Sequence, residues 1–402
     1  MTKKLAALFA VVSGLAIGNL YWAQPLLVQM TNDLGMEASR GGLLITATQI
    51  GYAIGILLLV PLGDILRRKR LVFILMLCSM ATLVACAAAP SFAFLGLALA
   101  SMGLVTVSGQ IILPMSGDLA KPEERGQIVG IVSSGITAGI LFSRFISGIV
   151  ADLWGWRMIY IIAAVLNCII AIVFIRCVPE VEAKDNIPYG KLIKSVFTTF
   201  AKHRVLPRIL IMTGMVFGIT FNLFWTGMTF LLSDAPFHYN TFQIGLVSLV
   251  GLVGAIAGVK VGTLQDKDMG IPALGCFAGL SIVCMVAVAW FSHSILAMAL
   301  IGAVFSLAVQ GISILCQARL FALSNTERSR LNTVFVVNNF IFCAIGSALT
   351  SVFWNIGGWS AVAVGGATAS FIALIDWLLA RKKFAEMDHS QKAEIIHYSQ
   401  NT

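Results

Sequence analysis

Long apolar runs separated by short polar segments dominate the pattern of this chain. Twelve of the runs are about 20 residues or longer and nearly free of charge, and an α-helix of about 20 residues crosses the hydrocarbon core of a bilayer. We therefore predict an all-α integral membrane fold with twelve transmembrane helices. The predicted spans are residues 5–30, 40–62, 71–89, 92–118, 127–151, 157–178, 207–232, 241–264, 271–291, 294–318, 331–354 and 359–380.

Composition identifies lipid as the main solvent of this chain. Residues of the set AVILMFWYC make up 58% of it, charged residues make up 11%, and the mean hydropathy is +0.92. A typical soluble domain is about one quarter charged, which argues against a soluble enzyme, a nucleic-acid-binding protein, a disordered chain or a secreted disulfide-rich module. The eight Cys lie in or at the ends of apolar runs, and we expect small apolar side chains rather than metal ligands or disulfides.

The distribution of basic residues predicts the orientation. Of the 27 Lys and Arg, 24 fall on the side of the two termini, Arg40 and Arg157 fall on the other side, and Arg144 lies within a span. Basic loop residues are retained in the cytoplasm. Both termini are therefore expected to be cytoplasmic.

An internal repeat divides the chain near its middle. Five short matches recur at an offset of 202 or 203 residues, each at the same place relative to its span. They are residues 19–22 with 222–225, 42–43 with 245–246, 62–64 with 264–266, 124–125 with 327–328, and 155–156 with 358–359. We predict two parallel six-helix bundles (1–178 and 207–383), a cytoplasmic linker (179–206) and a cytoplasmic tail (384–402).

The linker contains an amphipathic segment between Tyr189 and His203. Its apolar side chains share one side and lysines flank them, which is typical of a helix lying on the inner leaflet. A solvated linker with some helix is the alternative. The apolar residues are Leu192, Ile193, Val196, Phe197 and Phe200.

The loop after the second span carries a charged motif. In residues 62–70 (LGDILRRKR), Asp64, Arg68 and Lys69 match the pattern G-x-x-x-D-R-x-G-R-R. The mirrored loop keeps acidic and basic positions at Asp266 and Lys267. With the repeat, this motif resembles the major facilitator superfamily over the chain to about residue 383, which implies a twelve-helix fold that encloses a central cavity.

The fifth span is similar to the antiporter motif G-x8-G-x3-G-P-x2-G-G. Gly130, Gly139 and Gly148 match, and Arg144 takes the place of the proline. The motif is typical of drug:proton antiporters and of sugar or metabolite exporters. The resemblance implies export, protons as the coupling ion and a bacterial inner-membrane location, although Leu99 stands where relatives carry an arginine in the fourth span.

Polar residues within the spans are candidates for a substrate site, because polar side chains in hydrocarbon must face protein or a wet cavity. Interhelical hydrogen bonding is the alternative for each. The candidates are Asn19, Trp22, Gln49, Tyr52, Gln110, Arg144, Asn222, Trp225, Gln310, Gln317 and Asn339.

Arg144 is the sharpest candidate. Inserting an arginine at the centre of a membrane helix costs at least about 2.5–3.5 kcal/mol, so we expect a use for it: an anionic substrate group or a carboxylate partner. A purely structural tie between helices is the alternative. No Asp or Glu lies at the centre of a predicted span, and we expect Asp152 to pair with Arg157, and Asp376 with Arg381 or Lys382.

Charged residues at the cytoplasmic helix ends are expected to form two gating clusters, one in each half. The resemblance implies that these ion pairs latch the cytoplasmic side and break when the halves rock. Loop charge that only sets topology is the alternative. The cluster residues are Asp64, Arg68, Lys69, Asp118, Glu124 and Arg125 in the first half and Asp266, Lys267, Glu327 and Arg328 in the second.

The sequence therefore predicts a monomeric secondary transporter that exports a small polar or amphipathic organic solute by alternating access. An uptake permease for a sugar or organic acid, or a transport-dead receptor of the same fold, are the alternatives. An enzyme is disfavoured because we find no catalytic cluster, G-x-S-x-G or phosphate loop. The expected partners are the solute, the bilayer and protons, without nucleic acid, cofactor or metal.

Overall fold

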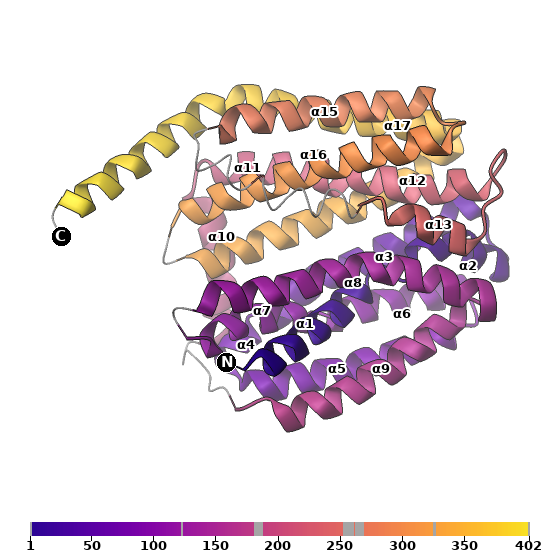
Figure 1. Cartoon of the computed structure of the whole chain (residues 1–402), viewed down its shortest axis with the longest axis horizontal. Coiled ribbons are helices and arrows are strands. Elements are labelled where there is room, and N and C mark those ends of the chain that lie inside the picture. Colours follow the sequence, from indigo (N-terminus) through magenta and orange to yellow (C-terminus); the bar gives the residue numbers. More distant parts are fainter. Residues whose placement is uncertain are drawn as a thin grey trace.

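The computed structural model describes residues 2–121, 124–180, 188–251, 261, 269–324 and 327–400. For Arg125 and for residues 387–400 it describes the backbone alone. Within these ranges every regular element is helical. Figure 1 shows long helices aligned along one axis, with the N-terminus and the C-terminal helix directed toward the same end.

The first half of the chain contains the helices of the first six predicted spans. Its 3₁₀ segments η1 (Gln24–Leu26) and η2 (Ala38–Arg40) flank α2. The helices are α1 (Lys3–Gly18), α2 (Leu27–Asp33), α3 (Gly41–Leu59), α4 (Leu62–Ile65), α5 (Arg68–Ala87), α6 (Phe92–Val105), α7 (Ser108–Leu119), α8 (Arg125–Trp154) and α9 (Trp156–Cys177).

The second half follows the short helix α10 (Tyr189–Lys202). Its remaining helices are α11 (Leu206–Thr213), the π-helical segment η4 (Gly214–Thr220), α12 (Phe221–Ser233), α13 (Thr241–Ser248), α15 (Gly270–Trp290), α16 (Ile295–Ala322) and α17 (Arg328–Gln400). Of the predicted span 241–264, only the part through residue 251 and residue 261 lie within the described ranges.

The described helices fit a multi-pass membrane protein. Nine of them are long and apolar enough to cross a bilayer in the described part of the chain. The last of these is two helices joined across Gly357 and Gly358, where the backbone leaves helical geometry, so it contains the predicted spans 331–354 and 359–380. Its helix continues to Gln400, well beyond the predicted end at 380.

Two predicted spans are broken rather than continuous. The first bends after Gly18 and resumes as η1 and α2, and the fourth is divided between α6 and α7 at Thr106. The two breaks face each other, because the Asn19 amide donates to the Thr106 hydroxyl at 3.1 Å and that hydroxyl donates to the Ala16 carbonyl at 2.8 Å. These side chains satisfy backbone and hydroxyl groups that a broken membrane helix leaves open.

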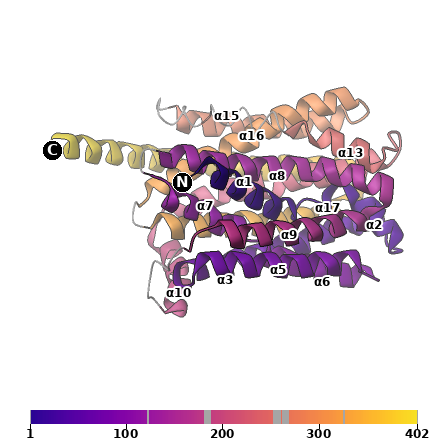
Figure 2. The ribbon, with the colours of Figure 1, turned by 60° about the horizontal axis from the view of Figure 1, so that its bottom comes forward.

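The helices of the two halves form neighbouring groups (Figures 1 and 2). Within the first half α1 packs on α8, α3 on α6, and α5 on α9. Within the second, α15, α12 and η4 pack on α17. The groups meet where α3 packs on α17 and where α8 packs on α13.

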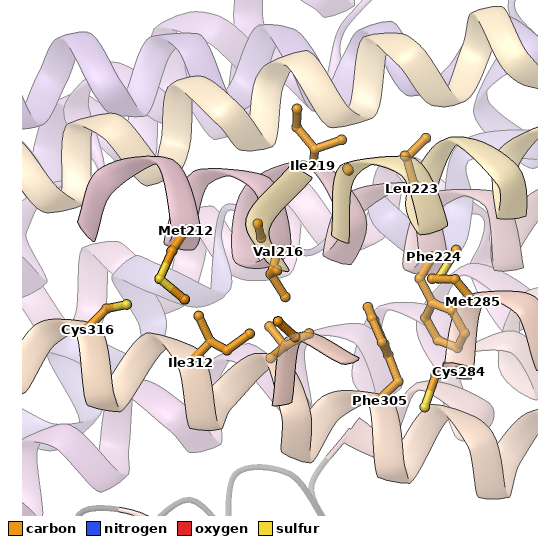
Figure 3. Packing of buried hydrophobic residues seen from close by; sticks show 14 of the residues in the cluster. Met212, Val216, Ile219, Leu223, Phe224, Cys284, Met285, Phe305, Ile312 and Cys316 are labelled. Atoms are coloured by element: carbon orange, nitrogen blue, oxygen red, sulfur yellow. The ribbon is translucent and has the colours of Figure 1, made fainter. Parts of the chain in front are cut away.

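The second half has a continuous apolar core around η4 and α16. Figure 3 shows Val216 and Ile312 directed toward each other between these elements. The rings of Phe224 and Phe305 lie 4.7 Å apart between their centres. Large apolar side chains such as Leu97 and Trp290 stay 68% and 81% exposed on the outer surface, as expected for helices that face lipid.

Candidate functional site

A cavity of about 780 Å³ lies between the two halves at the end that carries the charged loops. Gln110 and Ser133 line it from the first half, and Gln317 and Asn332 line it from the second. Helix α10 contributes Leu192, Ser195 and Val196 to the wall. Because both halves form the wall, a relative movement of the halves changes the size of this cavity.

Arg68 organises a charge cluster at the mouth of the cavity. Its guanidinium is 3% exposed and donates to Asp118 at 2.7 Å, to Asp64 at 3.1 Å and to the Gly63 carbonyl at 2.7 Å. The pairing joins the ends of α4, α5 and α7. Three of the predicted gating residues of the first half are therefore brought together.

The other predicted gating residues of the first half are placed differently. Lys69 is half-buried and Glu124 is exposed. The side chain of Arg125 lies outside the described part of the structure. Among the described residues, neither Lys69 nor Glu124 takes part in an ion pair of the Arg68 cluster.

Glu327 is the centre of a second charge cluster, in the second half. Its carboxylate accepts from Lys202 Nζ at 3.0 Å and lies 2.9 Å from His203 Nε2. The hydrogen bond to His203 is the main cause that lowers the pKa of Glu327, followed by the hydrogen bond to Lys202. Arg328 lies in the cavity wall, whereas the predicted members Asp266 and Lys267 lie outside the described residues.

Hydrogen bonds join the two halves at the opposite end of the molecule. Thr46 donates to the Ala344 carbonyl, and Thr229 to the Gln24 carbonyl, both at 3.1 Å. Thr241 donates to the Gly148 carbonyl at 3.1 Å. The halves are therefore closed at this end and separated by the cavity at the other.

Arg144 lies in the interior, on α8. Its side chain is 2% exposed, and its guanidinium carbon lies 4.8 Å from the centre of the Tyr21 ring, 5.3 Å from that of Trp225 and 5.8 Å from that of Phe221. Such distances are those of cation–π contacts. The prediction that Arg144 faces the protein interior rather than lipid is consistent with this placement.

Arg144 lies further from the charged end of the molecule than the cavity does. It follows the wall residue Ser133 by eleven positions on α8, which is roughly 16 Å of helix. Just beyond the wall residue Gln110, which donates to the Tyr52 hydroxyl at 3.1 Å, the Tyr52 ring contacts Phe340 of the other half with centres 4.4 Å apart. Aromatic side chains from both halves thus close the inner end of the cavity.

Several of the predicted substrate-binding residues make hydrogen bonds within the protein. Trp22 donates to Asn19 at 2.9 Å, and Ser347 donates to Asn222 at 3.1 Å. Gln317, in the cavity wall, donates to Asn332 at 3.3 Å.

Other predicted site residues carry buried polar atoms without a hydrogen-bond partner among the residues that the structure describes. These atoms are Gln49 Oε1, Asn339 Oδ1, Trp225 Nε1, and Nε and Nη2 of Arg144. Gln310, the remaining candidate, is half-buried on α16. The unpartnered donors of Arg144 and Trp225 lie on helices of different halves that face each other.

Two expected ion pairs are wrong. Arg157 pairs with Asp33 instead of Asp152, and Asp152 accepts from Asn240 at 3.4 Å. Asp376 pairs with Arg208 at 2.6 Å instead of with Arg381 or Lys382. Both errors arise because short sequence separation favours local partners, whereas packing of α9 on the first loop and of α11 on α17 brings distant ones closer.

The sequence reasoning also missed Tyr21 and Phe221, which surround Arg144. Phe217, Phe221 and Trp225 repeat every four residues, and this spacing places aromatic rings on one helix face. Tyr21 lies inside the repeated segment 19–22. Both signals were present in the sequence.

The helical membrane fold, the paired halves and the central cavity define a multi-pass transporter. The family model of the Major Facilitator Superfamily matches residues 7–323, and the chain belongs to this family of transporters.

Among its relatives, the uncharacterized transporter YgaY of Escherichia coli O157:H7 is 34% identical over 378 residues, which cover 94% of this chain and 95% of YgaY. The probable transporter SCO4007 of Streptomyces coelicolor is 27% identical over 90% of this chain and 84% of its own length. The solved structure of peptide transporter POT in complex with sulfate has the same fold, with a TM-score of 0.75, 16% identity and 96% of each chain covered.

Proposed function

We propose that this protein is a secondary active transporter that exports a small polar or amphipathic organic solute by alternating access, in antiport with protons. The observation that carries the proposal is the cavity of about 780 Å³ whose walls come from both halves and whose inner end is closed by ring contact between Tyr52 and Phe340. In alternating access, two bundles rock about a central site that opens to one side at a time.

The proposed orientation places the cavity mouth in the cytoplasm of a bacterial cell, with the protein in the inner membrane as a monomer. The mouth carries the Arg68 and Glu327 clusters, and 24 of the 27 basic residues belong to this side. The two proposed rocking units are residues 1–178 and 207–383. In the sequence the linker 179–206 connects them, and the tail 384–402 follows the second unit. With this orientation, the structure is open to the cytoplasm and closed to the outside.

Export and proton antiport are supported by the likeness of α8 to the antiporter motif. Two of its glycines allow close helix approach, because a β-carbon on Gly139 would lie 2.1 Å from the Gly14 carbonyl oxygen and one on Gly148 would lie 2.4 Å from that of Thr241. Gly148 thereby seals the outer end against α13 of the other half. An outer end closed by this contact fits a conformation in which solute enters from the cytoplasm.

The two charge clusters are proposed as gates. When the halves close over the cytoplasmic mouth, Asp64, Arg68 and Asp118 move against α16 and α17. Helix α10 already contacts both halves, because Tyr189 donates to the Leu58 carbonyl at 2.6 Å while Lys202 binds Glu327. It is therefore placed to follow the rocking motion.

Vesicles of opposite orientation test this function. Everted vesicles, whose cytoplasmic face is outside, should accumulate solutes from a panel of labelled drugs, sugars and organic acids when their lumen is made acidic, and vesicles without the protein should not. An uptake permease would accumulate the solute in right-side-out vesicles instead. Accumulation in neither orientation, for a protein shown to be folded, would contradict transport of these solute classes.

A further inference from the structure

We propose that Arg144 is the binding site for the carboxylate of an organic acid that carries a flat apolar ring. This inference rests on the proposed function and names the class of its solute. The site consists of Arg144 and Tyr21 from the first half and of Phe221 and Trp225 from the second.

The unpartnered atoms of Arg144 identify the ligand group. Nε and Nη2 are both buried and have no hydrogen-bond partner in the described part of the chain. In a guanidinium these two nitrogens direct their N–H groups along the same edge, and that edge binds a planar carboxylate through two parallel hydrogen bonds. The N–H groups of Nε and Nη2 are therefore placed to bind the two oxygens of one carboxylate.

The surroundings of Arg144 contain a further donor and no described acid. Trp225 Nε1 is buried without a partner, and the centre of its ring lies 5.3 Å from the Arg144 guanidinium carbon. Among the described residues, no carboxylate forms an ion pair with Arg144. Two donors of the Arg144 guanidinium and one of Trp225 thus lack a partner among the described residues, which favours an anion as the missing ligand.

The aromatic rings determine what the anion is attached to. The Tyr21, Phe221 and Trp225 rings cover the faces of the guanidinium, and aromatic rings prefer stacked or edge-to-face packing with another flat ring. When the halves part, a ring-bearing carboxylate can pack on the Tyr21 ring, which stays beside Arg144, and against the rings of Phe221 and Trp225 across the opening. An inorganic anion or a sugar would leave the same walls without a packing partner.

A ligand can reach Arg144 because the residues around it come from both halves. Phe221 and Trp225 belong to α12 of the second half, whereas Arg144 on α8 and Tyr21 after α1 belong to the first. Rocking of the halves therefore moves Phe221 and Trp225 away from the guanidinium, and Tyr21 stays beside it. The purely structural alternative is that the cation–π contacts hold the halves together. In that case no carboxylate stabilises the protein, and replacing Arg144 destabilises it without affecting any ligand.

The test is thermal stabilisation of the purified full-length protein by benzoate, benzamide and cyclohexanecarboxylate. Benzoate should raise Tm with a saturable dose dependence. Benzamide lacks the charge and cyclohexanecarboxylate lacks the flat ring, so both should give smaller shifts at equal concentration. Equal shifts from benzamide and benzoate would overturn the carboxylate assignment, equal shifts from the two acids would overturn the ring assignment, and no shift from benzoate would overturn the site.

Variants localise the effect to Arg144. Arg144→Lys keeps the charge but lacks the two-donor edge, and it should weaken the apparent affinity for benzoate about tenfold or more. Trp225→Phe keeps the ring and removes one donor, with a smaller loss. An unchanged affinity in Arg144→Lys would overturn the proposal. If either variant fails to fold, protection of Phe221→Cys from maleimide by benzoate replaces this readout, in protein whose eight native Cys are replaced by Ala. Absence of protection overturns the site.

Failure of this proposal is distinguishable from failure of the transport function. Two results do not depend on a ring-bearing acid being the solute. One is solute accumulation in everted vesicles, and the other is that the sealed end of the molecule opens while the cavity mouth closes. If these are observed while benzoate neither stabilises nor protects, the substrate class is wrong and the transporter is not.

Discussion

Arg144 and Ser347 occupy equivalent positions in the two repeats, 203 residues apart, and the carbonyl oxygen of each faces a glycine of the other half. A β-carbon added to Gly42 would lie 2.5 Å from the Ser347 carbonyl oxygen, and one added to Gly245 would lie 2.9 Å from that of Arg144. Gly42 and Gly245 are themselves 203 residues apart. The two contacts are therefore symmetry-related seals between the halves.

Substituting these glycines should open the sealed end. Gly42→Val introduces atoms into space held by the Ser347 backbone, and overpacking of this kind costs about 1–3 kcal/mol. We expect less oxidative cross-linking between cysteines at positions 152 and 240, whose native side chains are in contact. Gly96→Val is the matched control, because a β-carbon at Gly96 has no atom within 4 Å. Equal cross-linking in both variants would contradict the seal.

The Arg68 cluster should be energetically coupled across helices. Arg68→Ala leaves the carboxylates of Asp64 and Asp118 without their shared cation, so we expect a lower Tm than for Lys69→Ala, its matched neighbour. In a double-mutant cycle with Asp118→Asn, the coupling free energy should be about 1–3 kcal/mol. Additive effects of the two substitutions would show that the pair makes no net contribution.

Docking of α10 on the second half should weaken in acid. The pKa of Glu327 is lowered below its ordinary 4.5 by His203 and then by Lys202. A carboxyl group with a lowered pKa contributes stability that is complete above the ordinary pKa and is lost as the pH falls through the lowered one. The protection of α10 amides, measured as exchange relative to the intrinsic rate at each pH, should therefore be constant near neutral pH and decrease as the pH falls below about 4.5.

Glu327→Gln provides the control for this pH dependence. The variant should show low protection of α10 amides at neutral pH and little further loss of protection in acid. Asp33→Asn, at the opposite end of the molecule, should leave α10 exchange unchanged. A wild-type acid response that persists fully in Glu327→Gln would assign the effect to another group.

Removing only the cation of the Arg208–Asp376 pair should destabilise the protein more than removing both charges. Asp376 is 4% exposed and Arg208 is 35% exposed, so Arg208→Ala leaves a buried carboxylate without its cation. Breaking a buried pair costs roughly 3–5 kcal/mol, and we expect the lower end because Arg208 is partly solvated. Adding Asp376→Asn to Arg208→Ala should recover much of the lost Tm. A double variant less stable than Arg208→Ala would contradict this account.

The fold was predictable because its determinants are long and periodic. Apolar runs set the helices, and the 203-residue repeat, visible at residues 19–22 and 222–225, indicated two related halves. The break of the fourth span at Thr106 was not predictable in this way. It depends on a hydrogen bond from Asn19, which lies 87 residues away.

The candidate site could be anticipated in part from the sequence. Arg144 could be singled out because a lone cation in a membrane helix is costly. Its partners could not, because Tyr21 and Trp225 are brought together only by packing of the halves. The repeated Asn-x-x-Trp segments also differ in a way that sequence does not show: Trp22 donates to Asn19, whereas Trp225 Nε1 has no described partner.

The most direct test of alternating access measures distances at both ends of one molecule. Spin labels at positions 152 and 240 report the sealed end, and labels at 121 and 329 report the cavity mouth, in protein whose eight native Cys are replaced by Ala. When Gly42→Val separates the first pair, the second pair should come closer. If both distances stay fixed, or both increase together, the two halves do not exchange openings and the account is contradicted.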